Sequence, residues 1–260
     1  MTMPNHFYDE MNADADIREH YQAMDAWLKA QTPEHLADKR KQADLMFHKL
    51  GITFAVYGEE SGAERLIPFD IIPRIFPKTE WQQLEKGLRQ RVLALNMFLQ
   101  DVYHDQRILK EGLIPAERIL GNAQYRPEMQ GVDVARQIYS HISGVDIVRA
   151  GAGEFYVLED NLRVPSGVSY MLEDRKMMMR LFPELFSKYK VAPVAHYPDL
   201  LLDTLRSVAP NGIDDPTVVV MTPGAYNSAY FEHAFLAQQM GVELVEGKDM
   251  FVDDLHVYMR

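Results

Sequence analysis

The sequence contains no cysteine, and that absence alone excludes three kinds of site. Without a thiol there is no disulfide framework, no thiolate nucleophile and no zinc–thiolate centre. No apolar run approaches the roughly 18 residues that a membrane span needs, so we expect no membrane partner. The start of the chain, MTMPNHFYDEM, lacks the basic segment and apolar core of a secretory signal. We therefore expect a cytoplasmic protein.

Positive charge is also scarce: 27 Lys and Arg residues stand against 38 Asp and Glu, a formal net charge of -11. This balance argues against a nucleic-acid backbone as the main partner, although an acidic chain can still bind nucleotides through local sites and metal ions. What is present is typical of a globular chain: 260 residues, of which 47% are hydrophobic and 25% charged. The length suits one large domain or two ordinary ones.

One stretch, DIVRAGAGEFYVLEDNLRVPSGVSYMLEDR at 146–175, combines strand character with a dense polar end. The aromatic and aliphatic run FYVL at 155–158 suits a half-buried strand, and two glycines before it indicate a turn. The apolar residues of 145–148 form the preceding strand, so we expect a hairpin. Polar side chains crowded at a strand end are costly to bury without partners, which favours a ligand-facing site.

Strand alternation places Glu159 and Asn161 on one face of the second strand, with Asp146 of the first strand close to both. Two carboxylates and an amide oxygen directed at one point are the ligands that Mg²⁺ prefers beside phosphates. Asp160 faces the other way and is not expected to be a ligand. The alternative for the pair is an exposed polar strand face without function.

The C-terminal third predicts a strand at 217–221, a helix at 227–240 and a second strand at 242–245, which is a parallel βαβ unit. Asn227 and Ser228, in the loop after its first strand, contact a substrate or only cap the helix. Glu232 and His233 are adjacent on that helix and do not share a face, so catalysis there is the less favoured interpretation. For the acidic and histidine side chains near the end of the helix predicted at 80–103, we favour a solvated helix end.

The segment LEDNLRVPSGVSY resembles the strand-and-loop motif of ATP-grasp ligases, in which a Glu-x-Asn pair holds Mg²⁺ under the ATP phosphates. With three further stretches it resembles the circularly permuted ATP-grasp family of bacteria, whose members are often labelled glutathionylspermidine synthases. Those stretches are LIPFDIIPRI, ALNMFLQDVY and TPGAYNSAYFEHAFLAQQMGVELVEG. The resemblance covers about residues 50 to 260.

The resemblance implies roles for individual residues. It makes Glu159 and Asn161 the metal pair and Asp146 a third ligand. Arg163 lies two positions past Asn161 and shares its face if the strand continues, so it could neutralise a transferred phosphoryl group as a catalytic residue. The alternative is a salt bridge from Arg163 to Asp160 or Glu173.

The turn after the strand supplies the expected nucleotide contacts. Ser166 and Gly167 offer a hydroxyl and a backbone N–H at the start of a helix, an arrangement that binds anions. Arg175 either reaches the same pocket or is a surface arginine.

We therefore expect an α/β (mixed α+β), circularly permuted ATP-grasp-like fold with a small parallel α/β unit. The expected ranges are a helical N-terminal region at 1–140, the metal-binding half of the ATP-grasp sheet at 141–190, and the start of the parallel unit at 191–260. The implied function is ligation of a small-molecule or peptide carboxylate to an amine with ATP and Mg²⁺. Two alternatives are a non-catalytic ATP-grasp-like binding or scaffold module, and an unrelated α/β protein with a chance motif. The lysines that grip the nucleotide in this family are expected beyond Arg260, so we expect the chain to be a piece of a longer protein with little activity alone.

Overall fold

The computed structural model describes residues 8–13, 16–55, 64–210 and 212–260. They fall into two compact units: unit 1 contains Met1–Tyr8 and Phe76–Pro165, and unit 2 contains Asp9–Ile75 and Ser166–Arg260. The predicted mixed α/β class is confirmed. The units follow packing, whereas the three ranges expected from the sequence follow motifs, so their boundaries differ and those ranges stay a prediction.

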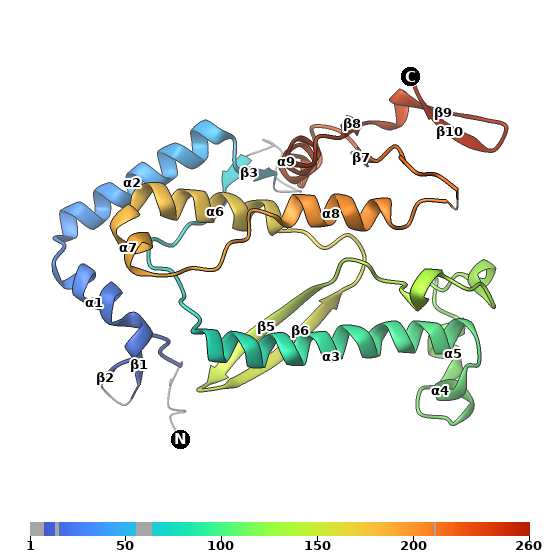
Figure 1. Cartoon of the computed structure of the whole chain (residues 1–260), viewed down its shortest axis with the longest axis horizontal. Helices are drawn as coiled ribbons and strands as arrows, with labels where there is room; N and C mark the ends of the chain where they lie inside the picture. Colours follow the sequence, from blue (N-terminus) through green and yellow to red (C-terminus); the bar gives the residue numbers. More distant parts are fainter. Residues whose placement is uncertain (1–7, 14–15, 56–63, 211) are drawn as a thin grey trace. The chain divides into compact units, whose positions relative to one another are not determined.

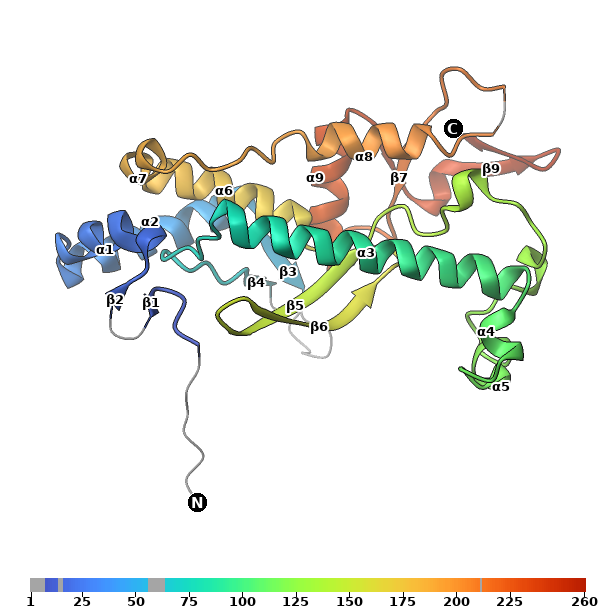
Figure 2. The same ribbon diagram turned by 60° about the horizontal axis from the view of Figure 1, so that its bottom comes forward.

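Unit 1 is built on one long helix and one hairpin. Helix α3 (Lys78–Tyr103) carries apolar residues at three- and four-residue steps, the spacing that predicted a helix over 80–103. Strands β5 (Gly144–Gly151) and β6 (Glu154–Asn161) pair antiparallel, which confirms the predicted hairpin. The hairpin lies against α3 in both ribbon views (Figures 1 and 2).

Short helical segments follow α3: α4 (Arg107–Lys110), α5 (Ala116–Leu120), η2 (Pro127–Met129) and η3 (Ala135–Gln137). The Asp101 carboxylate accepts from the backbone N–H groups of Arg107 and Ile108, at 2.9 and 3.0 Å. His104 bonds to the carbonyl of Gln100 and the carboxylate of Asp133. These side chains therefore stabilise the end of α3, and Asp101 and His104 are half-buried where a solvated helix end was expected.

Unit 2 begins with small strands and helices. They are β1 (Asn12–Ala13), β2 (Asp16–Ile17), η1 (Glu19–Tyr21), α1 (Gln22–Lys29), α2 (Pro33–Leu50), β3 (Thr53–Ala55) and β4 (Glu64–Leu66). Thr32 caps α2 by accepting from the His35 N–H at 3.2 Å, and Gly51 ends the helix with a φ of 66°.

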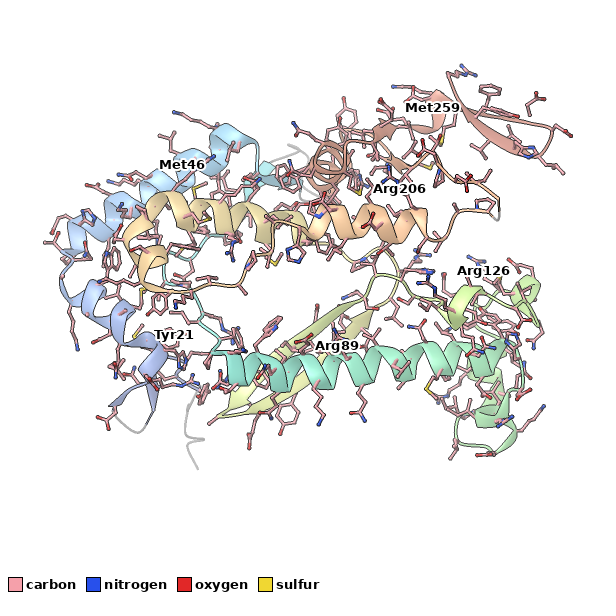
Figure 3. The ribbon with its side chains drawn as sticks, in the orientation of Figure 1. Tyr21, Met46, Arg89, Arg126, Arg206 and Met259 are labelled. Carbon is pink, nitrogen blue, oxygen red and sulfur yellow. The ribbon has the colours of Figure 1, made fainter. Side chains whose placement is uncertain are left out.

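Helices α6 (Val168–Leu181) and α7 (Pro183–Lys188) complete the core of this unit. Its buried members are Tyr21 (labelled in Figure 3), Met24, Trp27, Ala43, Phe47, Ile52, Ile71, Met177, Met178, Leu181, Phe182 and Leu185. Met177 and Met178 therefore pack into this core, while Met179 is exposed.

The rest of unit 2 contains α8 (Tyr197–Arg206), β7 (Val219–Met221), α9 (Tyr230–Met240) and β8 (Glu243–Val245). Strands β7 and β8 pair in parallel, which confirms the predicted βαβ unit. After η4 (Gly247–Asp249), β9 (Met250–Asp253) and β10 (His256–Met259) form an exposed antiparallel pair. Within the described ranges, no helix combines the length and apolar character needed to cross a bilayer.

Candidate functional site

The open end of the β5–β6 hairpin gathers the predicted metal ligands. Asp146 lies directly opposite Glu159, and Gly144 lies opposite Asn161. Residues that oppose one another in an antiparallel pair point to the same face, so the three side chains share one face of the ribbon. The Asn161 side-chain amide donates to Glu159 Oε1 at 3.2 Å. The structure therefore brings together the residues that strand alternation grouped.

A β-bulge decides which face they occupy. The register steps from Asp146–Glu159 to Ile147–Val157, which leaves Leu158 as an extra residue on β6. Val157 consequently points to the side that lines a space with α3, and Glu159 points to the opposite side. In an unbroken strand these two residues would share a face. The bulge thus turns Glu159 and Asn161 away from α3, a re-aiming role that bulges often have near sites.

Asp160 shows the same geometry from the other face. Its carboxylate forms an ion pair with Arg91 of α3, with contacts of 2.6 to 3.0 Å. The hydrogen bond from Arg91 lowers the pKa of the Asp160 carboxyl from its ordinary value. This pairing agrees with the prediction that Asp160 is not part of the ligand face.

The ligand face carries unbalanced negative charge. Asp146 and Glu159 are both exposed, and neither has an ion-pair partner among the residues that the structure describes. Like charges directly opposite one another destabilise a strand pair, so a bound cation would relieve the repulsion. Tyr156 and Val148 are opposite one another on this face and are 59% and 41% exposed, which places an apolar strip beside the acidic pair.

The donor set fits Mg²⁺ in chemistry and number. Mg²⁺ takes hard oxygen ligands in octahedral geometry and usually keeps several waters, bound through one or two carboxylates plus substrate phosphates. Among the described residues, no group of three or more His, Cys, Asp or Glu side chains is placed to hold a metal ion. The hairpin cluster has only two carboxylates, to which Asn161 adds one amide oxygen. A Mg²⁺ ion held there would keep coordination positions for phosphate oxygens.

The chain after β6 is held close to the start of β5. Ser140 Oγ donates to the carbonyl of Leu162 at 3.2 Å. A Cβ added at Gly144 would lie 2.7 Å from the Pro165 Cβ, so the absence of a side chain at 144 allows Pro165 to pack there. These contacts direct the segment 162–165 back across the base of the hairpin.

Arg163 lies outside the strand. Because β6 ends at Asn161, the alternation that would have placed Arg163 on the ligand face does not extend to it. Its guanidinium is exposed and donates to Gln124 Oε1 at 3.4 Å. The two carboxylates considered as structural partners bind other cations: Asp160 pairs with Arg91, and Glu173 pairs with Lys176.

Ser166 and Gly167 lie at the start of unit 2, and part of this turn is already occupied. The Gly167 N–H donates to both carboxylate oxygens of Glu232, at 2.9 and 2.8 Å. The Ser166 side chain is exposed. Arg175 is eight positions beyond Gly167, about 12 Å further along α6. It packs over the Phe186 ring, at 5.7 Å, so the structure does not bring Arg175 to the turn.

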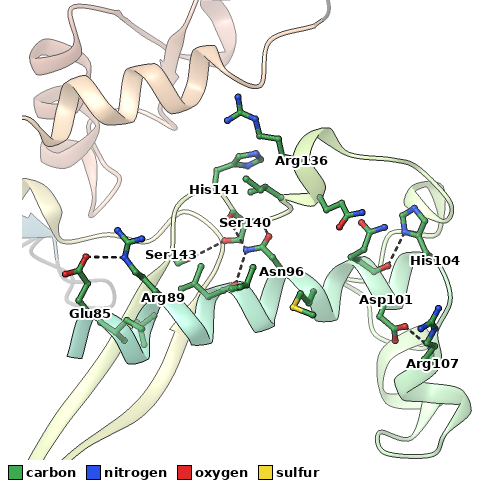
Figure 4. A pocket seen from close by; sticks show the side chains of 18 of the residues that line it. Glu85, Arg89, Asn96, Asp101, His104, Arg107, Arg136, Ser140, His141 and Ser143 are labelled. Carbon is green, nitrogen blue, oxygen red and sulfur yellow. Dashed lines mark hydrogen bonds and ion pairs between the residues drawn. The ribbon is translucent and has the colours of Figure 1, made fainter. Parts of the chain in front are cut away.

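A second candidate is a groove of about 1200 Å³ between one face of α3 and residues 136–145 (Figure 4). Most of its polar groups are engaged within the protein. Asn96 accepts from the backbone N–H groups of Tyr139 and Ser140, at 2.7 and 3.0 Å. Arg136 and His141 line the groove and have no hydrogen-bond or ion-pair partner in the described part of the chain. Asn96 was not predicted as a site residue, although a polar residue within the apolar stripe of a helix is a usable signal in the sequence.

Comparison with known proteins shows the family. A family described as "A circularly permuted ATPgrasp" matches residues 73–260. This chain therefore belongs to the circularly permuted ATP-grasp family, and the resemblance found in the sequence is confirmed.

The relatives are similar over nearly all of this chain. An uncharacterized protein of Synechocystis sp. is 47% identical, with 99% of this chain and 54% of the relative aligned. An uncharacterized protein of Mycobacterium tuberculosis is 45% identical over 97% of this chain and 45% of the relative. A protein of Frankia casuarinae named "Putative glutamate–cysteine ligase 2-2" is 37% identical over 97% of this chain and 29% of the relative. The chain thus spans about half the length, or less, of these relatives.

The fold is similar to that of a solved structure. That structure is a glutathione synthetase-like effector from Globodera pallida, solved without ligand, with a TM-score of 0.56 and 13% sequence identity. The superposition covers 88% of this chain and 55% of that chain. This likeness concerns the fold alone.

Proposed function

We propose that this chain supplies the metal-binding part of an ATP-dependent ligase that joins a carboxylate to an amine. The observation that carries the proposal is the shared exposed face of Asp146, Glu159 and Asn161 at the open end of the hairpin. Membership of an ATP-grasp family supports it, as does the glutamate–cysteine ligase name of one relative. The activity, substrates and partners of the whole protein are part of this proposal.

The reaction needs charge neutralisation more than covalent chemistry from the protein. A substrate carboxylate oxygen attacks the γ-phosphorus of ATP, ADP leaves, and an amine then displaces phosphate from the acylphosphate to form the amide. Bound Mg²⁺ would offset the negative charge of the phosphate oxygens. In the proposal, the oxygens of Asp146, Glu159 and Asn161 hold that ion, and the chain's remaining contribution is positioning.

Other residues of the chain take supporting roles in the proposal. Arg163 would pair its planar guanidinium with phosphoryl or carboxylate oxygens, since it is exposed and, among the described residues, forms only a long hydrogen bond to Gln124. The exposed strip of Tyr156 and Val148 beside the acidic pair would cover an apolar part of the ligand. The Ser166 hydroxyl would bind a phosphate or carboxylate oxygen.

The test uses the full-length protein and measures ADP release with Mg²⁺, a panel of carboxylates and a panel of amines. We expect Glu159→Gln to lower turnover by at least about 100-fold, the scale of losing one charge-stabilising group. It should also raise the Mg²⁺ concentration needed for half-maximal rate. The matched control is Asp160→Asn, the same chemical change one residue along β6 on the face toward α3, with turnover within about threefold of wild type.

Equal losses in Glu159→Gln and Asp160→Asn would contradict the assignment of the ligand face. Binding of Mg²⁺ and ATP without ADP formation, with every acid and amine tried, would favour the alternative of a non-catalytic module.

A further inference from the structure

Two adjacent residues of α9 each hold a different loop of unit 2. The Glu232 carboxylate accepts from the N–H groups of Gly167 and Ser169, which open helix α6. His233 Nδ1 makes a 2.9 Å hydrogen bond with Thr222 Oγ1, in the loop that follows β7. The first loop follows β6 and the second follows β7, so both are loops at strand ends.

The bond from Glu232 replaces an ordinary local cap. A helix usually begins with a Ser, Thr, Asp or Asn whose own side chain accepts from the first free N–H groups. Helix α6 instead has Gly167 at this position, with a φ of 105° and no side chain to serve as a cap. The missing acceptor comes from Glu232, 65 residues later in the sequence. The positive end of the α6 dipole favours an anion at this place.

The Glu232 carboxylate is buried, so it needs its hydrogen bonds to the start of α6. Glu232 is 5% exposed, and a buried carboxylate needs hydrogen-bond partners that balance its lost hydration. Its charge also acts on two tyrosines: the pKa values of Tyr170 and Tyr197 are raised, first by burial and then by Glu232. The carboxylate therefore lies near Tyr170 of α6 and Tyr197 of α8.

The second loop is held in a comparable way. Thr222 is 1% exposed, and its hydroxyl oxygen also accepts from the Gly224 N–H at 3.1 Å. Gly224 has a φ of 111°, a conformation that side chains other than glycine rarely adopt. The Thr222 side chain thus connects the turn at Gly224 to His233 on α9.

We propose that Glu232 and His233 form a positioning pair that couples the loop at 166–169 to the loop at 222–224. Both side chains project from the first turns of one helix, so a shift of α9 moves both loops together. The loop at 166–169 also begins unit 2, directly after Pro165, the last residue of unit 1. The consequence for catalysis rests on the proposed function: the pair would fix the position of Ser166 relative to the loop after β7 within unit 2.

The decisive variant changes the loop at 222–224, and its effect is measured at the loop at 166–169. Thr222→Val keeps the side-chain shape, removes the hydroxyl that bonds to His233, and leaves every contact of Glu232 in place. Amide hydrogen exchange of the purified chain would be followed at 167–170. We expect exchange there to accelerate about threefold in Thr222→Val, because α9 is no longer held at its second anchor.

Glu232→Gln gives the reciprocal measurement. It should accelerate exchange at 167–170 by at least about tenfold, the scale of losing a hydrogen bond to a charged group. It should also accelerate exchange at 224–227 by about threefold. Glu243→Gln, the same change at an exposed carboxylate on β8, is the control and should alter neither segment.

Acceleration confined to the loop that each variant touches would overturn the coupling. The exchange measurement needs no turnover, so it decides the coupling even if the ligase proposal fails. In the full-length protein, both variants should lower kcat by about tenfold and leave the KM for ATP within about twofold. If the variants lose stability without this selective fall in kcat, Glu232 and His233 have a structural role only.

Discussion

The two ends of the β5–β6 hairpin differ in whether their charged side chains are paired. At the turn end, the side chain of Arg149 is 1% exposed and its guanidinium donates to both carboxylate oxygens of Glu80, at 2.9 Å each. It also lies over the rings of Tyr8 and Phe155, at 4.6 and 5.2 Å. At the open end, Asp146 and Glu159 face each other in solvent, with no cation paired to either in the described residues.

This difference distinguishes charged residues that stabilise the fold from charged residues that are available for binding. The turn end shows charge that supports the fold, because Arg149 joins the hairpin to the first turns of α3 through a matched network. The open end shows charge that the fold does not require, since the same two strands would pair better without it. Local conflicts of this kind are expected where a protein binds something. The following variants test this contrast, from the largest expected effect to the smallest.

Arg149→Ala should cause the largest loss of stability. It removes one partner of a largely buried ion pair, so the Glu80 carboxylate loses both hydrogen bonds from the guanidinium. We expect the free energy of unfolding to fall by about 3–5 kcal/mol. Urea unfolding followed by circular dichroism measures it. The control is Arg89→Ala, which breaks an exposed pair with Glu85 on the same helix and should cost less than about 0.5 kcal/mol. Similar losses in both variants would remove the distinction.

Arg163→Ala should affect activity instead of stability. We expect turnover of the full-length protein to fall, because the activation free energy rises by about 3 kcal/mol, with little change in ATP affinity. Arg163→Lys should not restore the rate, because lysine keeps the charge without the planar fork. Thermal unfolding should change little, since the side chain is exposed and its hydrogen bond to Gln124 is long, at 3.4 Å. Normal turnover in Arg163→Ala would exclude it from the site.

Asp174 tests whether an unmatched carboxylate costs stability where no ligand face exists. Its Oδ1 is buried and has no hydrogen-bond partner among the described residues, and burial followed by the charge of Glu173 raises its pKa from 3.8 to about 6. A raised carboxyl pKa means that the folded state binds the proton more tightly. The stability contributed by that proton is full below about pH 4 and is lost as pH rises through about 6.

Asp174→Asn should therefore match the wild type near pH 4 and be more stable above pH 6 by about 1–3 kcal/mol. Unfolding in urea across this pH range measures the difference. Asp203→Asn, at an exposed position on α8, should show no such pH dependence. A constant difference between Asp174→Asn and wild type across the range would contradict the account.

Asp160→Asn should have the smallest effect. Its pair with Arg91 is partly exposed, with 43% of the arginine side chain accessible, so we expect a loss of about 1 kcal/mol or less at pH 7. Because the pKa of Asp160 is lowered in the folded state, that stability is present above its unfolded value and is lost as pH falls through the folded pKa. A double-mutant cycle with Arg91→Met isolates the pair. A coupling far above this value would show that the hairpin depends on the Asp160–Arg91 pair.

Alternation and turn residues were enough to predict the hairpin, the shared face of Glu159 and Asn161, and the βαβ unit, because each depends on neighbours in sequence. The bulge at Leu158 was not predictable in this way. The residues on either side of it have tertiary neighbours: Asp160 binds Arg91, 69 residues away, and Val157 lines a space with α3. The end of β6 at Asn161 likewise depends on contacts of the following segment with Ser140 and Gly144. The capping of α6 by Glu232 was missed because the two residues are joined only by tertiary packing.

The close approach of Pro165 to Gly144 also restricts how the two strands can align during folding. A slip of two residues keeps every side chain on its own face, so alternation alone does not reject it. Such a slip would place Ile142 or Asp146 opposite Asn161, beneath Pro165, where even a Cβ is 2.7 Å from the ring. Gly144 therefore fixes the register of the two strands. Its lack of a side chain selects, among alignments of equal polarity, the one that sets Asp146 opposite Glu159.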